Sequence, residues 1–248
     1  MSHNVKFLIV SDIHGNREAL EAVLKDARGR YDRIVCLGDI VGYGADPNFV
    51  VDWARAKVSA IVRGNHDAAC AGIESLSRFN DNAADAVAWS QRVLSPMNLA
   101  YLKGLPAGPL PHEGFDLAHG SPFREYDYLC SKRDVAAISE RMTTPLTFFG
   151  HTHAQGGFEV KGNGKINMIN PHHLPTGLVL AGRSKYLVNP GSVGQPRDRD
   201  RDAAYAIHSP AEGRIEFRRV EYNAKKAGNK IVKAGLPEWL ASRLLVGA

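Results

Sequence analysis

Three structural signals follow one another in the segment Val5-Lys-Phe-Leu-Ile-Val-Ser-Asp-Ile-His-Gly-Asn16. Val5–Val10 is a nearly continuous apolar run, as expected of a strand that is covered on both faces. Asn16 can cap a following helix whose apolar residues recur at helical spacing. Asp12 and His14 lie between the strand and the helix. The segment therefore predicts a strand, a polar turn and a helix, which is the repeating unit of a parallel sheet.

Two more units of this kind follow within the first 70 residues. Arg33–Leu37 and Ser59–Val62 are predicted strands, and Asp46-Pro47 is typical of a helix start between them. Three units with short connections predict a parallel sheet with helices on both faces. Later in the chain, Gly162-Asn-Gly164 and Glu212-Gly213 predict antiparallel hairpins instead.

The expected fold class is therefore α/β (α+β), with two packed mixed β-sheets flanked by helices. The sequence shows no linker, so we expect one domain over residues 1–248, with the motifs in about 5–195 and a hairpin and a helix in 203–248. Ser75–Leu94 predicts one long helix, and Gly104–Pro111 predicts a connection. The lysine-rich stretch from Lys225 to Lys233 predicts a solvated helix.

Composition excludes several classes of protein. Of 248 residues, 44% are hydrophobic and 23% charged, which excludes a disordered chain and a coiled coil. No apolar run approaches the roughly 18 residues of a membrane span, so we expect no membrane partner. Three cysteines without a C-x-x-C pair predict a reducing, cytoplasmic location. The net charge of +5 weakly favours an anionic partner.

Five predicted strands end in residues that can bind a metal ion or a phosphate. These residues are Asp12 and His14, then Asp39, then Asn65 and His66, then His119, and last His151 and His153. Because ligands of open α/β sheets bind beyond the carboxyl ends of the strands, the side chains should converge on one crevice. Each signal alone is more typical of a capping or core residue. The complete set on five strand ends indicates a ligand site.

The donor set indicates which ions this site would hold. Leaving His66 aside, it offers two carboxylates, one amide carbonyl and four imidazoles, and no thiolate. Such a set suits Mn²⁺, Fe, Zn²⁺, Co²⁺ or Ni²⁺ better than Ca²⁺ or a structural zinc. Seven ligands are more than one ion takes and are suited to two ions that share a carboxylate. Two ions ~3.5–4 Å apart support in-line displacement at phosphorus.

These motifs resemble the calcineurin-like metallophosphoesterases, in the order found in that family. The matching elements are Asp12-Ile-His14, Gly38-Asp39, Gly64-Asn-His-Asp67, His119 and Gly150-His-Thr-His153. Three longer strings, Ser11–Asn16, Gly38–Gly44 and Asn189–Gly194, resemble the small bacterial and archaeal phosphodiesterase branch, often described as diadenosine tetraphosphatase-like. The resemblance implies a four-layer sandwich of two mixed sheets between helices.

The resemblance also implies a role for each residue. The first metal would be held by Asp12, His14, Asp39 and His153, and Asp39 would bridge to a second metal completed by Asn65, His119 and His151. A metal-bridging hydroxide would hydrolyse a phosphate ester, with Mn²⁺ the expected metal. His66 would face the substrate, and Asp67 would orient its imidazole. Asn16 and Arg197 are further candidates for substrate binding.

Two departures from the wider family narrow the function. Gly42-Tyr-Gly44 stands where the Ser/Thr phosphatase branch has Asp-Arg-Gly, which disfavours protein phosphatase activity. No metal ligand is missing, which disfavours a pure scaffold. A phosphodiester or a phosphomonoester, including a nucleotide, remains open as substrate.

Other functions also stay open. The chain could be a dinucleoside polyphosphate hydrolase, or a metal- and nucleotide-binding interaction module with little turnover. The modest charge disfavours a nucleic-acid partner. We expect the substrate pocket to be built from Ala71–Asn80, Pro122–Leu129 and Pro171–Pro175. The oligomeric state cannot be predicted from the sequence.

Overall fold

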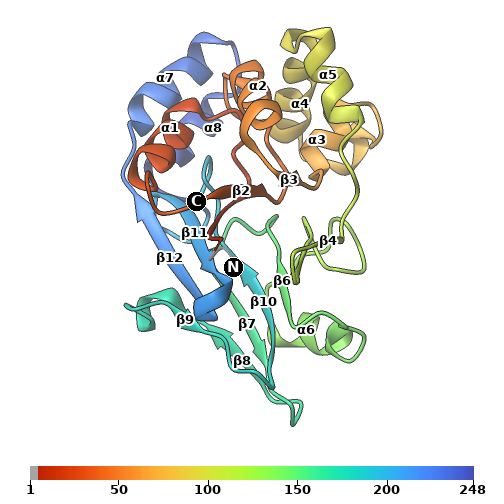
Figure 1. Ribbon diagram of the computed structural model, residues 1–248. Coiled ribbons are helices and arrows are strands. Elements are labelled where there is room, and N and C mark those ends of the chain that lie inside the picture. The colour runs from red at the N-terminus through yellow and green to blue at the C-terminus, as the bar shows by residue number, and fades with distance from the viewer. Residues whose placement is uncertain (1–4) are drawn as a thin grey trace.

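Two mixed sheets face each other across a shared apolar core in the computed structural model, which describes residues 5–248 (Figure 1). In this part of the chain the first sheet has the strand order β3-β2-β1-β11-β12-β9. Its strands are β1 (Phe7–Val10), β2 (Arg33–Cys36), β3 (Ala60–Ile61), β9 (Leu178–Val179), β11 (Ala203–Ser209) and β12 (Arg214–Val220). Strands β1, β2 and β3 are parallel, and β11 joins β1 antiparallel.

The second sheet has the order β4-β5-β6-β10-β7-β8. Its strands are β4 (Leu110–His112), β5 (Phe115–Leu117), β6 (Leu146–Phe148), β7 (Gly156–Val160), β8 (Ile166–Ile169) and β10 (Lys185–Asn189). Strands β5, β6 and β10 are parallel, whereas β7 and β8 form the predicted hairpin.

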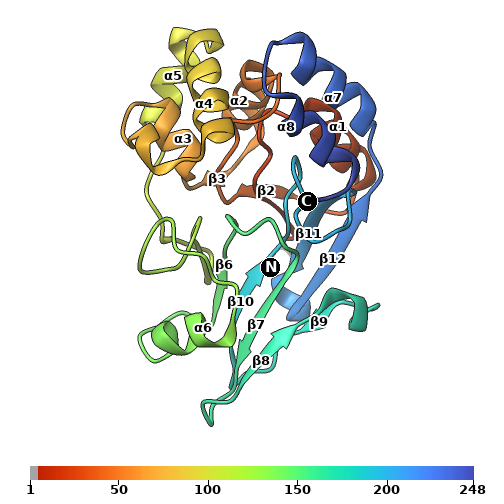
Figure 2. The same cartoon turned by 180° about the vertical axis from the view of Figure 1, so that it is seen from behind.

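The helices lie outside the sheets (Figures 1 and 2). They are α1 (Arg17–Asp26), α2 (Pro47–Lys57), α3 (Asn65–Cys70), α4 (Asp81–Val93), α5 (Pro96–Lys103), α6 (Lys132–Ser139), α7 (Ala224–Lys233) and α8 (Glu238–Ser242). Helix α6 packs on the second sheet, beside β7 and β8, and the other helices lie on the side of the first. The predicted class of two mixed sheets flanked by helices is confirmed. No helix within residues 5–248 is long and apolar enough to cross a membrane.

Strand β1 shows how the sequence specifies this layering. All four of its residues are buried. Successive side chains of a strand point to opposite faces. Leu8 and Val10 accordingly pack with the helices in one core cluster, and Phe7 and Ile9 pack with the second sheet in another. The apolar run predicted from the sequence is thus a strand between two layers. A core shared by both sheets favours the single-domain interpretation.

The structure corrects two predicted elements. The stretch 75–94 is divided, because Ser75 caps a short 3₁₀ helix, η1 (Leu76–Arg78), and Asn80 caps α4 anew by accepting a hydrogen bond from the Ala83 backbone N–H. Between them the chain is extended at Phe79. The predicted connection 104–111 ends in strand β4, whose first residue pairs with Leu117 of β5.

The C-terminal helix is also not simply solvated. One face of α7 is buried in a core cluster that includes Ile231. On its polar face, Lys226 and Lys230 lie 3.0 and 2.8 Å from a Glu18 carboxylate oxygen. The helix is therefore amphipathic and docked on the loops around α1, and it is followed by α8 and the 3₁₀ helix η4 (Arg243–Leu245).

Two adjacent residues of α7 test this docking. Ile231 is 2% exposed and Val232 is 45% exposed. We expect Ile231→Ala to lower the free energy of unfolding by about 2–4 kcal/mol, because it leaves a cavity in the core. The matched control Val232→Ala should change it by less than about 0.5 kcal/mol. Urea unfolding of the two variants measures the difference, and equal effects would show that α7 is not packed by this face.

Candidate functional site

The predicted strand-end residues converge into two buried groups. In the first group, ligand atoms of Asp12, His14, Asp39 and His153 all lie within 4.8 Å of one another, and in the second so do those of Asp39, His119 and His151. Asp39 belongs to both groups. The turns that follow β1, β2, β5 and β6 therefore bring together six of the seven candidate metal ligands.

Asn65 completes the second group. It is the first residue of α3, directly after the turn that ends β3. Its Oδ1 lies 3.2 Å from His119 Nε2, which in turn lies 3.4 Å from Asp39 Oδ2. The amide oxygen is thus directed at the same centre as the imidazole and the shared carboxylate.

Backbone carbonyls fix the tautomers of three of the imidazoles. The Nδ1 atom of His14 lies 2.9 Å from the carbonyl oxygen of Val41. The Nδ1 atoms of His119 and His153 lie 2.8 Å and 2.6 Å from the carbonyl oxygens of Leu37 and Gln195, respectively. A carbonyl only accepts, so each Nδ1 must carry the hydrogen and donate it. Each Nε2 then presents its lone pair to the interior of the site, which is the arrangement of metal-binding histidines.

The imidazole nitrogens at the centre of the site are arranged as they would be around a cation. His14 Nε2 and His153 Nε2 are 3.1 Å apart, with a lone pair on each when Nδ1 is protonated. Two such lone pairs repel unless a proton or a cation lies between them. In addition, His151 Nε2 is buried and has no hydrogen-bond partner among the described residues. The residues present therefore fit a divalent cation.

Burial and charge shift the pKa values of the site in opposite directions. Burial lowers the pKa of His14 and His153 well below the usual range, so these rings are neutral. The pKa of Asp39 also lies well below its usual value, because the imidazoles, His119 above all, outweigh burial. Asp39 in turn raises the pKa of His119 to about 9 against the effect of burial. A bound cation would take the place of that proton.

The backbone around the ligands is strained. Five candidate ligands have left-handed φ angles: Asp12 (53°), His14 (49°), Asp39 (53°), His151 (64°) and His153 (58°). This conformation costs about 1–2 kcal/mol for each residue other than glycine. It persists where neighbouring contacts enforce it, and it clusters at functional sites. Here Asp12 N donates to Gly38 O and His14 N donates to Asp39 O, so backbone hydrogen bonds join the turn after β1 to the turn after β2.

The Asp67 carboxylate binds backbone N–H groups and makes no hydrogen bond to His66 Nδ1, which corrects the orienting role that the resemblance implies. Its two carboxylate oxygens accept hydrogen bonds from the backbone N–H groups of residues 39, 40, 41 and 64, at 2.7, 2.9, 3.2 and 2.9 Å. Burial and the Asp39 charge raise the pKa of Asp67 to about 7, against the pull of these donors. Asp67 therefore positions Asp39 by holding its backbone.

A pocket of about 100 Å³ opens over the two groups. It is lined by Asp39, Tyr43, Asn65, His66, Arg78, Phe79, Asn80, Ala83, Tyr128, His151, His153 and Arg197. The predicted segments 71–80 and 122–129 both contribute, whereas none of the lining residues comes from 171–175. Sequence reasoning missed Tyr43, although an aromatic residue between two glycines was visible. It named no residue within 122–129, where Tyr128 stacks on His151 with ring centroids 4.0 Å apart.

Arg197 reaches the pocket from the loop that follows β10. Its Nη2 donates to Gln195 Oε1 at 2.9 Å, and its Nε is buried without a partner. In the described part of the chain Arg197 makes no ion pair, and it lines the pocket together with Asp39. Arg219 binds Asp198 and Asp200, so the alternating tract 197–202 is partly packed.

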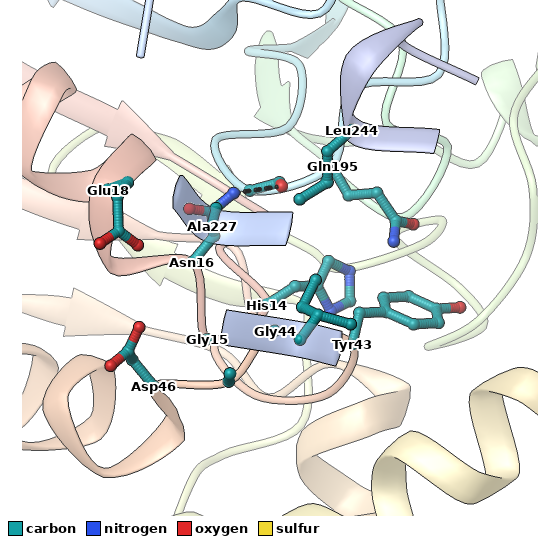
Figure 3. A pocket seen from close by; sticks show the side chains of 13 residues that line it. His14, Gly15, Asn16, Glu18, Tyr43, Gly44, Asp46, Gln195, Ala227 and Leu244 are labelled. Atoms are coloured by element: carbon teal, nitrogen blue, oxygen red, sulfur yellow. Dashed lines mark hydrogen bonds between the residues drawn. The ribbon is translucent and has the colours of Figure 1, made fainter. Parts of the chain in front are cut away.

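Asn16 does not reach this pocket. Its Oδ1 accepts from Ala19 N at 3.1 Å and caps α1, and its Nδ2 donates to Gly194 O at 2.8 Å, the dashed line in Figure 3. Asn16 was expected to bind substrate, but in the structure its side chain connects the start of α1 to Gly194. Asn16 instead lines a narrow cavity of about 10 Å³ behind His14, which has room for about one water molecule.

Comparisons with known proteins agree with this geometry. The family model described as the calcineurin-like phosphoesterase superfamily domain matches residues 5–213. An uncharacterized protein of Methanocaldococcus jannaschii is 40% identical over 252 residues, covering 96% of this chain and 97% of that protein. The crystal structure of a metallophosphoesterase from Sphaerobacter thermophilus is 40% identical, with a TM-score of 0.84, and covers 98% of this chain and 99% of that one. A hypothetical protein from Pyrococcus horikoshii, 19% identical with a TM-score of 0.77, has the same fold over 98% of this chain and 99% of its own.

The positioning role of Asp67 leads to a testable expectation. Asp67→Asn replaces one acceptor oxygen with a donor, so at least one buried backbone N–H loses its partner. We expect a loss of about 1–3 kcal/mol in the free energy of unfolding. We also expect Mn²⁺ affinity to fall by at least about tenfold, because the loop that carries Asp39 loosens.

Urea unfolding and calorimetric Mn²⁺ titration measure these two effects. The exposed helix residue Asp85 supplies the control Asp85→Asn, which should change neither. Unaltered Mn²⁺ affinity in Asp67→Asn would contradict the positioning role.

Proposed function

The chain belongs to the calcineurin-like phosphoesterase superfamily, and on that premise we propose that it hydrolyses a small phosphate ester at a dinuclear metal site. One observation carries the proposal: two buried ligand groups share the carboxylate of Asp39. A shared carboxylate between two such groups suits a pair of divalent ions rather than a single one.

Each ligand would have a defined place. Asp12, His14, Asp39 and His153 would hold the first ion, and Asp39, Asn65, His119 and His151 would hold the second. Mn²⁺ is the metal we expect, with Fe, Zn²⁺, Co²⁺ and Ni²⁺ as alternatives that accept the same nitrogen and oxygen donors. When bound, such ions lower the pKa of a water molecule and neutralise the charge of the phosphoryl oxygens.

Two residues of the chain would act on the substrate directly. Arg197 would bind a phosphoryl oxygen, since it brings a positive charge to the pocket and its Nε is buried without a partner among the described residues. His66 would donate a proton to the leaving oxygen. Burial lowers the pKa of His66 to about 4, so the free ring is neutral. The charge of a bound phosphate ester would raise this pKa, and proton delivery would therefore depend on substrate binding.

The pocket has room for the reacting group over the ligand residues. Its volume of about 100 Å³, bounded by Tyr43, Phe79 and Tyr128, admits a phosphoryl group with part of its alcohol. The remainder of a phosphodiester, a phosphomonoester or a nucleotide would extend out of it. Three unpaired cysteines, Cys36, Cys70 and Cys130, suit the reducing, cytoplasmic setting predicted from the sequence.

Removal of the metal tests the reaction itself. The wild type should hydrolyse at least one member of a panel of mono- and diesters of 4-nitrophenyl phosphate after reconstitution with Mn²⁺. Exhaustive chelation should abolish this turnover, and added Mn²⁺ should restore it. Asp39→Asn should abolish it with the fold intact by circular dichroism, because both ions lose a ligand. Full turnover after chelation would contradict the proposal. Metal binding without turnover of any ester, dinucleoside polyphosphates included, would favour an interaction module.

His66→Ala separates metal binding from proton transfer. We expect unchanged metal content, because His66 belongs to neither ligand group, and a kcat lowered by about 10²–10⁴. Elemental analysis and steady-state kinetics measure the two quantities. Loss of metal from this variant would show that His66 is a ligand and that its assignment here is wrong.

A further inference from the structure

Within residues 5–248, no hydrogen bond orients the His66 ring through its Nδ1. The side chain is 3% exposed, and its Nδ1 is buried without a hydrogen-bond partner among the described residues. The neighbouring carboxylate of Asp67 is occupied by backbone N–H groups. A residue that must aim one nitrogen at a leaving oxygen therefore needs another source of orientation.

Aromatic packing supplies this orientation. The centroid of the His66 ring lies 4.4 Å from that of Tyr43, at an interplanar angle of 54°, and 5.0 Å from that of Phe79, edge to face at 83°. A Cβ atom at Gly42 would overlap His66 Nδ1, so the backbone of residue 42 lies directly against this side of the imidazole. The Phe79 contact is edge to face and the Tyr43 contact is tilted, and the His14 ring also packs edge to face on His66 at 4.9 Å. Aromatic pairs have preferred geometries, so close packing on these sides restricts rotation of the imidazole.

Tyr43 is itself held from two sides. It is 7% exposed and has a left-handed φ of 57° between Gly42 and Gly44. Its hydroxyl oxygen lies 3.4 Å from Arg197 Nη2. Its ring belongs to the same apolar cluster as Ile231 of α7 and Leu244 of η4.

The C-terminal elements reach the site in part through the Tyr43 ring. Figure 3 shows Tyr43 beside His14 in the wall of the cavity that Ala227 and Leu244 also line. The rings of Tyr43 and His14 are 4.6 Å apart. Tyr43 thus joins the last helices of the chain to the centre of the site, beside Phe79, which packs on the same cluster and lines the pocket.

We propose that Tyr43 is a positioning residue: supported by α7 and η4, its ring aims the His66 imidazole into the pocket, while its hydroxyl holds Arg197. The inference rests on the proposed function only for the role of His66 as proton donor. The orientation of the ring is a property of the protein that can be measured without turnover.

Nuclear magnetic resonance of histidine rings tests the orientation. Zinc-loaded, ¹⁵N-histidine-labelled protein is suitable because Zn²⁺ has a filled d shell and is not redox active, and the His66 signals are assigned by their absence from His66→Ala. We expect one set of His66 ring signals in the wild type and in Tyr43→Phe, which keeps the ring. Tyr43→Leu should show broadened or doubled signals. A single set at unchanged positions in Tyr43→Leu would overturn the proposal.

Two further variants provide an alternative substitution and a control for this experiment. Leu244→Ala removes the support behind Tyr43 without altering a residue of the pocket, and it should broaden the same signals. It replaces Tyr43→Leu if that variant fails to fold. Tyr31→Leu is the matched control, because Tyr31 packs on another core cluster and lines neither the pocket nor the cavity behind His14. It should leave the His66 signals and kcat unchanged.

A double-mutant cycle tests whether Tyr43 acts through His66. In the wild-type background, Tyr43→Leu should lower kcat by at least about tenfold with unchanged metal content, whereas in His66→Ala it should lower kcat by less than about twofold. Tyr43→Phe should mainly raise KM, by about two- to tenfold, since only the contact with Arg197 is lost. Equal losses in both backgrounds, or loss of metal from Tyr43→Leu, would overturn the proposal.

The two measurements separate this inference from the proposed function. If wild-type protein hydrolyses no ester but Tyr43→Leu disorders the His66 ring, the proposed function fails and the positioning role stands. If wild-type protein is active and the ring signals of Tyr43→Leu are unchanged, only the positioning role fails.

Discussion

The carboxylate of Asp67 ties together the loops that follow β2 and β3. Four backbone N–H groups donate to its two oxygens, three from residues 39–41 and one from residue 64. Asp39, the residue common to both ligand groups, is thereby held through its backbone. Its Oδ1 also accepts a hydrogen bond from the His66 backbone N–H at 2.9 Å, and its Oδ2 faces the imidazoles of His14 and His119. Gly64 is required at the same junction, since a Cβ atom there would overlap the Asp39 carboxylate. The geometry of both ligand groups depends on this junction.

A site built in this way concentrates strain and like charge in the middle of the molecule. Left-handed backbone at five ligands and a cluster of buried ionisable groups both oppose folding. The cores on either side of β1 offset them, because they bury apolar side chains on both faces of the strand that leads into the site. A bound cation would relieve the repulsion between the inward-facing imidazole lone pairs, and it would therefore stabilise the folded state as well as the chemistry.

Segments that are far apart in the sequence meet around the pocket. Tyr43 comes from the loop after β2, Arg197 from the loop after β10, and α7 and η4 from the last 25 residues. Only the stacking of the two sheets and the docking of α7 on the loops near α1 bring these segments together (Figures 1 and 2). The geometry of the site therefore depends on residues of α7 and η4 that do not line the pocket.

The sequence alone determined the architecture and indicated the candidate ligands, six of which the structure brings into two buried groups. The apolar run in β1, the turn signals and the positions of Asp12, Asp39 and His119 at strand ends were sufficient, because strand direction and the sheet edge at which ligands gather follow from local pattern. The sequence could not determine what orients those ligands. The family resemblance implied that Asp67, which follows His66, orients its imidazole, yet Asp67 binds backbone groups up to 28 residues away. Asn16 was predicted to bind substrate and instead joins α1 to Gly194. Such contacts join loops that are distant in the chain, and they depend on how two sheets and a C-terminal helix pack, which no local pattern encodes.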